Sequence, residues 1–243
     1  MSIVNIIFEN KDFVICDKPA HVLSTPDRFK TDRPCLGLEL QKQLQLQIFP
    51  VHRLDFEVSG LIIYAKNAQA HKASQDWFSK KIIRKTYEAL TCEQNFDHWP
   101  QNIPAARDLI SFQPHKEFEW QMKIMRGKRR SFESVHGDLA LTLAQMKELL
   151  SVYQKDEAKR NLIYWRLQPV TGRAHQLRLE LSRHGFPILN DVLYGGVSFE
   201  SSGLGAQWPN GGIALRSIEI QIQSSEADLF SLPKVIKINP LQH

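Results

Sequence analysis

The sequence contains little cysteine: only Cys16, Cys35 and Cys92 occur in 243 residues. Their number is odd and no two form a C-x-x-C pair, so neither a disulfide framework nor a zinc site is predicted. We therefore expect a reducing, cytoplasmic setting for this chain.

Long apolar runs are also missing. No stretch approaches 18 uninterrupted apolar residues, and the first residues show no basic region leading into an apolar one. We therefore expect no membrane partner. There is no internal repeat or low-complexity segment, which disfavours a solenoid. No phosphate-loop or dinucleotide-binding signature is present, which is consistent with our expectation of no cofactor and no metal.

The charge balance is mildly basic. Lys and Arg number 31 against 26 Asp and Glu, a net charge of +5, and 42% of the residues are hydrophobic. This composition is typical of a globular protein and compatible with nucleic acid as a partner. Residues 116–130 contain six Lys or Arg and two Glu, a local balance of +4. That stretch is a candidate RNA-backbone contact, and a solvated basic loop is the alternative.

The hydrophobic patterning predicts alternating strands and helices. We expect a hairpin from 3–8 and 13–16, a short helix carrying Leu36, Leu40 and Leu44, a strand at 61–65, and a helix from the N-cap Asn67 to about 80. Further strands are predicted at 87–91 and 161–167. Residues 95–112 are predicted as a loop. Residues 139–153 fit helical spacing, although their Leu-Ala-Leu-Thr start equally fits a strand.

A further helix is predicted from Ala174 to His184, closed by Gly185. Its spacing places Arg173 and Arg178 on opposite flanks of an apolar stripe. Arginines in such positions are normally solvated.

Three local signals carry possible chemistry. Asp55 lies in the segment 51–60, just before the apolar strand, and either acts as a carboxylate nucleophile or caps a turn. Tyr87 follows the cations Arg84 and Lys85 and either stacks on a nucleobase or belongs to the core. Residues 170–178 form a glycine turn into a helix start that is dense in hydrogen-bond donors, where oxyanions bind readily.

Together, in this order, the three segments resemble pseudouridine synthases of the RluA-type family. The matching segments are His52-Arg53-Leu54-Asp55 with Ser59-Gly60, Lys85-Thr86-Tyr87-Glu88-Ala89, and Gly172-Arg173-Ala174-His175-Gln176-Leu177-Arg178. Asp17-Lys18-Pro19 and the stretch 185–195 also look like the family, so the resemblance spans about residues 5–195.

The resemblance implies a role for each matching residue. Asp55 corresponds to the nucleophile that attacks the target uridine, Tyr87 to the tyrosine that packs against the base, and Arg178 to the cation that pairs with the aspartate. A paired cation favours the ionised form of a carboxylate. The expected RNA-binding residues are His52, Arg53, Arg84, Lys85, Lys128, Arg129, Arg130, Arg173, His175 and Gln176.

The chain departs from the family pattern at several positions. Leu179-Glu180 stands where Val-His is usual, and Leu215-Arg216-Ser217 where Leu-His-Ala is usual. The segment 95–160 matches poorly. We expect these departures to affect the choice of substrate more than the chemistry.

The resemblance implies an α+β fold with a mixed, largely antiparallel sheet, flanking helices and a central active-site cleft. We expect one catalytic domain over 1–243, with 95–160 as a divergent, partly basic excursion and no N-terminal RNA-binding module. The expected partner is ribosomal or transfer RNA, not DNA, and the expected state is a monomer.

Two alternatives remain. One is an RNA-binding or RNA-folding protein whose modifying activity is lost or secondary. The other, a glycosidase, needs a second carboxylate near the first. Glu57 is two residues from Asp55 and would point the opposite way in an extended segment, which disfavours such a pair.

Overall fold

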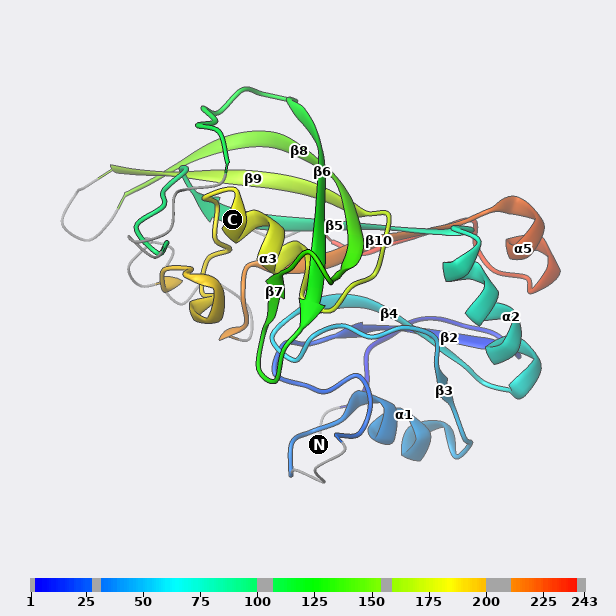
Figure 1. The fold of residues 1–243 in the computed structure, drawn as a ribbon. Coiled ribbons are helices and arrows are strands. Elements are labelled where there is room, and N and C mark those ends of the chain that lie inside the picture. Colours follow the sequence, from blue (N-terminus) through cyan, green and yellow to red (C-terminus); the bar gives the residue numbers. More distant parts are fainter. Residues whose placement is uncertain (1–2, 28–31, 100–106, 154–158, 200–210, 240–243) are drawn as a thin grey trace. The chain divides into compact units, whose positions relative to one another are not determined.

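The computed structural model describes residues 3–27, 32–99, 107–153, 159–199 and 211–239 (Figure 1). Two compact units emerge from the internal contacts: unit 1 comprises 1–85 and 216–240, and unit 2 comprises 86–215 with 241–243. Within the described residues the chain passes between the units twice, once within strand β5 and once within strand β10. Each unit is described by itself below.

Unit 1 is built on a mixed sheet in the order β1-β2-β4-β10. Strand β4 pairs antiparallel with β2 and parallel with β10, while β3 adds to β4 and β11 to β10. The bounds are β1 Ile6–Glu9, β2 Phe13–Lys18, β3 Phe49–Pro50, β4 Ser59–Ala65, β10 Leu215–Ile222 and β11 Val235–Lys237. The predicted hairpin at the start of the chain and the predicted apolar strand are confirmed.

The helices of unit 1 are α1 (Leu36–Leu44), α2 (Ala68–Ser79) and α5 (Ser224–Leu229). Asn67 caps α2 as predicted, because its side chain accepts a hydrogen bond from the Ala70 amide (2.8 Å). Trp77 of α2 is fully buried and packs against Phe13 and Phe230, with ring centroids 5.0 and 5.8 Å away. This aromatic core joins α2 to the sheet and to the end of α5.

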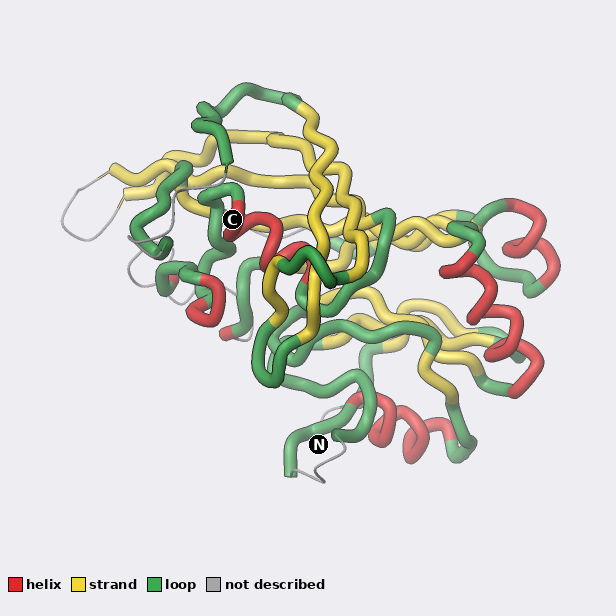
Figure 2. Tube along the Cα trace, viewed as in Figure 1, coloured by secondary structure: helices red, strands yellow, loops and turns green. Residues whose placement is uncertain are grey.

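Unit 2 is built on an antiparallel sheet in the order β5-β9-β8-β6-β7. The bounds are β5 Ile83–Cys92, β6 Glu117–Arg126, β7 Ser131–Glu133, β8 Asp138–Tyr153 and β9 Lys159–Pro169. Strands dominate this unit (Figure 2). The predicted excursion 95–160 therefore contains strands β6, β7 and β8 and the start of β9, while its residues 100–106 and 154–158 lie outside the described part.

The helical alternative for 139–153 is wrong, because this segment is the long strand β8. Its burial alternates with period two: Ala140, Thr142 and Ala144 are buried, whereas Leu139 and Leu143 are exposed. Partners on both sides, β6 and β9, supply the hydrogen bonds that select the strand. Leucines on the outer face of β8 created the misleading helical spacing.

Helix α3 (Gln176–Arg183) lies against the sheet of unit 2 and contacts β6, β7 and β9 (Figure 1). The helix ends at Arg183 and is closed, as predicted, by Gly185, which has the left-handed φ of +79°. A short 3₁₀ helix, η1 (Val192–Tyr194), follows. All residues from Gln176 to Ser182 are buried, so α3 is enclosed and has no solvated flank.

These elements confirm an α+β fold with a mixed, largely antiparallel sheet. The predicted single domain over 1–243 and the predicted central cleft stay predictions. In the described residues, no helix is long and apolar enough to span a membrane. No group of three or more His, Cys, Asp or Glu side chains there is placed to hold a metal ion.

Candidate active site

Asp55 lies in a tight turn between β3 and β4 of unit 1. The turn is closed by the Val58 amide, which donates to the Asp55 carbonyl (3.2 Å). Just before it, the Leu54 amide donates to Ser24 Oγ (3.0 Å) and Ser24 Oγ donates to the Leu54 carbonyl (2.9 Å). Tyr64 of β4 in turn donates to the Ser24 carbonyl (2.7 Å). The half-buried Asp55 is therefore held on a fixed backbone.

Lys18 is fully buried beside this turn. Its Nζ donates to the carbonyls of Pro19 (2.9 Å), Val22 (2.8 Å) and Phe56 (3.5 Å). Burial lowers the pKa of Lys18 to about 7, and the nearby carboxylate of Asp55 acts in the opposite direction. The motifs do not predict Lys18 as a site residue, although its Asp17-Lys18-Pro19 segment resembles the family.

Gly60 and Arg216 join the strands next to the turn. Gly60 has a φ of +112°, and a Cβ there would lie 2.2 Å from the Ser217 carbonyl oxygen of β10. Only glycine fits that close approach. Arg216 donates from Nη2 to Asp17 Oδ2 (2.6 Å) and from Nη1 to Ser59 Oγ (3.3 Å). The residue that departs from the family pattern thus links β2, β4 and β10.

His52 is attached to the backbone of β4. Its Nε2 accepts a hydrogen bond from the Ile63 amide (3.2 Å), which requires that nitrogen to be unprotonated. Burial, followed by the charge of Lys85, lowers the pKa of His52 to about 3. His52 therefore positions the start of the Asp55 segment, and its contact with RNA stays a prediction.

The other predicted cations of unit 1 differ in exposure. Arg53 and Arg84 are exposed. Lys85 is half-buried, with its Nζ 5.2 Å from the centroid of the Phe78 ring, and burial lowers its pKa to about 8. The exposed pair is thus the more accessible to a phosphate.

Tyr87 belongs to unit 2, where it stands opposite Leu167 of β9. Only 6% of its surface is exposed. Such burial suits a core residue and equally suits a wall against which a base packs, and the contact of Tyr87 with a base stays a prediction.

Arg178 is buried in α3 and forms a bidentate ion pair with Asp191. Its Nε lies 2.7 Å from Asp191 Oδ2 and its Nη2 lies 2.8 Å from Oδ1, with side-chain exposures of 2% and 1%. The Tyr194 ring centroid is 5.3 Å from its Cζ. A solvated position for Arg178 is therefore wrong, because nearly every face of α3 is covered. The motifs do not predict Asp191 as a site residue, although the stretch 185–195 that contains it resembles the family.

Gln176 holds the turn that precedes α3. Its Oε1 accepts from the Arg173 amide (3.0 Å) and from Thr171 Oγ1 (2.8 Å), while its Nε2 donates to the Leu141 carbonyl (3.0 Å) and to Thr142 Oγ1 (2.9 Å). All four hydrogen-bonding positions of the amide are used inside the protein. An effect of Gln176 on RNA would therefore act through the turn.

The neighbouring residues Arg173 and His175 are more accessible. Arg173 donates from Nε to the Leu139 carbonyl (3.0 Å) and pairs with Asp138 (3.3 Å), with 40% of its side chain exposed. His175 Nδ1 lies 3.1 Å from the Tyr194 hydroxyl. Tyr194 thus connects this turn to the ion pair of Arg178.

Lys128, Arg129 and Arg130 are exposed in the turn between β6 and β7, which we call the basic turn. The Gly127 amide donates to the Arg130 carbonyl (2.9 Å), and a Cβ at Gly127 would lie 2.6 Å from that oxygen. The predicted basic stretch is therefore a strand followed by a tight turn. Three cations are concentrated at the end of a hairpin.

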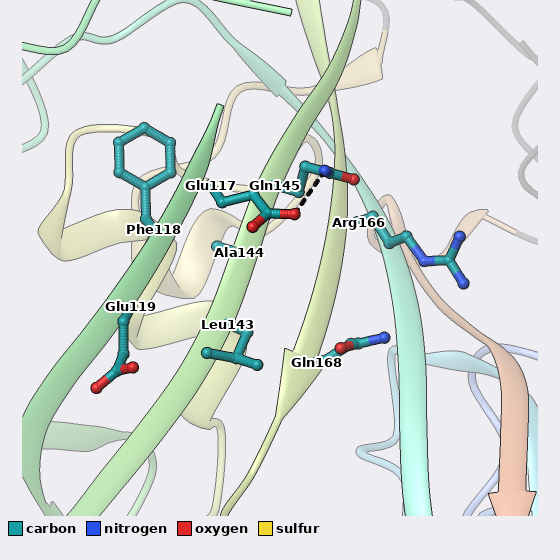
Figure 3. Close-up of a pocket in the computed structure, with 8 residues that line it drawn as sticks. All are labelled: Glu117, Phe118, Glu119, Leu143, Ala144, Gln145, Arg166 and Gln168. Carbon is teal, nitrogen blue, oxygen red and sulfur yellow. Dashed lines mark hydrogen bonds between the residues drawn. The ribbon is translucent and has the colours of Figure 1, made fainter. Parts of the chain in front are cut away.

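A separate pocket of about 410 Å³ opens on the sheet of unit 2 (Figure 3). Its lining combines two carboxylates, two amides and the guanidinium of Arg166, and a hydrogen bond joins Gln145 to Glu117 (2.9 Å). None of the predicted site residues lines it. The pocket is therefore distinct from the segments described above.

The predicted site is divided between the units. Unit 1 carries His52, Arg53, Asp55, Arg84 and Lys85. Unit 2 brings Arg173, His175, Gln176 and Arg178 together around one turn and also carries Tyr87 and the basic turn.

Comparison with known proteins identifies the family. A family model described as RNA pseudouridylate synthase matches residues 12–183. The chain belongs to the RNA pseudouridylate synthase family. It is 30% identical over 195 residues to "Dual-specificity RNA pseudouridine synthase RluA" of Vibrio parahaemolyticus, covering 78% of this chain and 68% of that protein.

Further comparisons agree with the RluA-type resemblance. The chain is 30% identical over 196 residues to "Ribosomal large subunit pseudouridine synthase C" of Rickettsia typhi, covering 78% of this chain and 56% of that protein. The solved structure of human RNA pseudouridylate synthase domain containing 1 has the same fold, with a TM-score of 0.66 and 22% identity, covering 100% of this chain and 93% of that one. The predicted family, fold class and enzyme class are confirmed. The protein is an isomerase that acts on RNA.

Proposed function

We propose that this pseudouridine synthase modifies uridines of ribosomal or transfer RNA with Asp55 as its nucleophile. The observation that carries the proposal is the fixed turn at Asp55, in which a half-buried carboxylate stands beside the buried ammonium of Lys18. The relatives named above act on RNA, and one is named for the large ribosomal subunit.

The proposed reaction breaks the C1′–N1 glycosidic bond of one uridine and forms a C1′–C5 bond to the same base. Asp55 attacks C1′ and the C1′–N1 bond breaks. The detached base turns and attacks C1′ through C5, which breaks the Asp55–C1′ bond and regenerates the carboxylate, while C5 loses a proton and N1 gains one. No electrons are exchanged with a partner. In the proposal Arg178, which forms a bidentate pair with Asp191, is also the cation that pairs with Asp55.

The target nucleotide has to leave its stack before Asp55 can reach it. Flipping a nucleotide costs a few kcal/mol, and stacking on an aromatic ring returns about 1–3 kcal/mol per base. We assign that stacking to Tyr87, whose burial opposite Leu167 of β9 gives the ring little freedom to move. A rigid ring loses little entropy when a base packs on it.

The exposed cations are assigned to the RNA backbone. Lys128, Arg129 and Arg130 provide three charges at the basic turn, and Arg53, Arg84 and Arg173 provide more beside the predicted site segments. Cations on phosphates release counterions and supply affinity that is independent of sequence. We further propose a monomer that works in the cytoplasm without binding DNA.

The experiment is a modification assay. Purified protein is incubated with total RNA from a strain that lacks the gene, and pseudouridine is mapped by carbodiimide adducts and primer extension. We expect a new stop in ribosomal or transfer RNA with the wild-type protein and none with Asp55→Asn. A matched control, Glu57→Gln, alters a neighbouring carboxylate and should retain the stop.

The remaining alternative is an RNA-binding protein whose modifying activity is lost or secondary. It predicts the same binding of RNA by the wild type and Asp55→Asn, with no new stop from either. That result would overturn the proposed reaction.

A further inference from the structure

Glu180 is a buried carboxyl that the proposed reaction does not use. It stands in α3, two residues after Arg178, where the family usually has His. Its exposure is 0%, and burial raises its pKa to about 8. Its Oε1 is buried without a hydrogen-bond partner in the described residues. A group that is costly to bury requires a local reason for its presence.

The other carboxyl oxygen of Glu180 accepts a hydrogen bond from the hydroxyl of Thr142, which belongs to β8. Thr142 Oγ1 also accepts a hydrogen bond from Gln176 Nε2 (2.9 Å). A hydroxyl has one hydrogen to donate, so donation to Glu180 directs a lone pair of Thr142 toward Gln176. The two bonds therefore support each other.

The orientation of the Gln176 amide is fixed independently at its far side. Its Oε1 faces the Arg173 amide, which is only a donor, and its Nε2 faces the Leu141 carbonyl, which is only an acceptor. A continuous series of hydrogen bonds therefore runs from Glu180 through Thr142 and Gln176 to the Arg173 backbone. We call it the Glu180 network.

We propose that Glu180 is a positioning residue that holds the Gly172–Arg178 segment in place through Thr142 and Gln176. The residues positioned in this way are Arg173 and His175, which face the RNA in the proposed function. The expected effect on catalysis rests on the proposed function. The structural part of the proposal, which is the restraint on the Arg173 amide, is independent of that function.

The structural part is tested by amide hydrogen exchange. In Glu180→Leu, which has similar bulk and no acceptor, we expect protection of the Arg173 amide to fall by about tenfold or more. Glu180→Gln keeps an acceptor oxygen for Thr142 and should retain the protection. Thr142→Val breaks the same series of hydrogen bonds at its next member. Combining it with Glu180→Leu should reduce the protection of the Arg173 amide little further than either variant alone.

Ser182→Ala is the matched control. Ser182 lies on the same buried helix and donates to the Tyr194 carbonyl (2.8 Å), outside the Glu180 network. Its loss should destabilise α3 and leave the Arg173 amide protected. Unchanged protection in Glu180→Leu, or an equal loss in Ser182→Ala, would overturn the proposal.

The functional part is tested by measuring the tritium that the enzyme releases from total RNA labelled at uridine C5. Glu180→Leu should raise KM about tenfold with kcat within about threefold of wild type, and Glu180→Gln should restore both. A change confined to kcat would contradict positioning of the RNA-facing turn. Release that is absent even from the wild type would reject the proposed function, while hydrogen exchange would still decide the role of Glu180.

Discussion

At the scale of single residues, the chemistry-bearing side chains depend on partners that are distant in the sequence. Lys18 reaches the carbonyl of Phe56, 38 residues away, and Arg178 pairs with Asp191. The motifs identified Asp55 and Arg178 because their spacing is local. Motif spacing did not predict Lys18 or Asp191, because each of their contacts forms with a segment that only folding brings near.

His52 shows how one bond fixes a protonation state. Nε2 accepts the Ile63 amide proton, so an imidazolium would lose this bond and leave the amide without its acceptor. The pKa of His52 is lowered from 6.5 to about 3 in the folded protein. The unfolded chain therefore binds more protons between these values, and stability must fall as pH decreases from about 6.5 toward 3.

Protonation of Glu and Asp side chains also lowers stability at acid pH. The variant His52→Gln separates the contribution of His52 from that of the carboxyl groups. Glutamine offers an oxygen to Ile63 and does not titrate. The free energy of unfolding, measured with urea from pH 7 to pH 4, should fall more steeply in the wild type. The difference in slope should be below about 1.4 kcal/mol per pH unit because the ring is half-buried. Parallel slopes in the two proteins would contradict this role.

At the scale of elements, local signals predicted most of the structure. The cap at Asn67, the glycine that ends α3 and the apolar run of β4 were each readable from a few neighbours. Strand β8 was not, because its leucines lie on the outer face and mimic helical spacing. What selects the strand is pairing with β6 and β9, a non-local effect that a sequence window does not contain.

The basic turn gives the prediction that belongs to this scale. Reversing Lys128, Arg129 and Arg130 to Glu should weaken RNA binding and flatten its dependence on salt. Each lost phosphate contact reduces the slope of log K against log salt by about 0.7–0.9, so three contacts predict a change of about 2–3. The measurement is fluorescence anisotropy with total transfer RNA and with ribosomal RNA fragments, at several salt concentrations.

The control for this variant is reversal of Lys11, Lys72 and Lys81, three exposed lysines of unit 1. It changes the net charge by the same amount at another place. Equal flattening in both variants would mean that overall charge, and not the basic turn, determines the affinity.

At the scale of the whole molecule, the important feature is that unit 1 is discontinuous. Its sheet and core require residues from 216 onward, including Ile220, Ile222 and Phe230. A chain that ends at Ala214 should therefore fail to fold unit 1, since β4 loses β10 and Trp77 loses the Phe230 ring. Hydrogen exchange should show little protection in β2 and β4.

Two comparisons make this prediction specific. A chain ending at Asn239 keeps β10, α5 and β11 and should show native protection. Supplying residues 213–239 as a separate peptide should restore part of the protection in the shortened chain. Native protection in the chain that ends at Ala214 would show that the first 85 residues are self-sufficient.

The two passages of the chain between the units also have a consequence for biosynthesis. The segment from β1 to α2 emerges from the ribosome early. Strand β10, which pairs with β4, emerges only after residues 86–215 have been made. At about 5–20 residues per second, that delay is roughly 7–26 s. During this interval the core side chains Leu61, Ile63 and Trp77 lack the apolar partners that residues 216 onward supply. The yield in cells should therefore depend on chaperones that shield these side chains until synthesis ends.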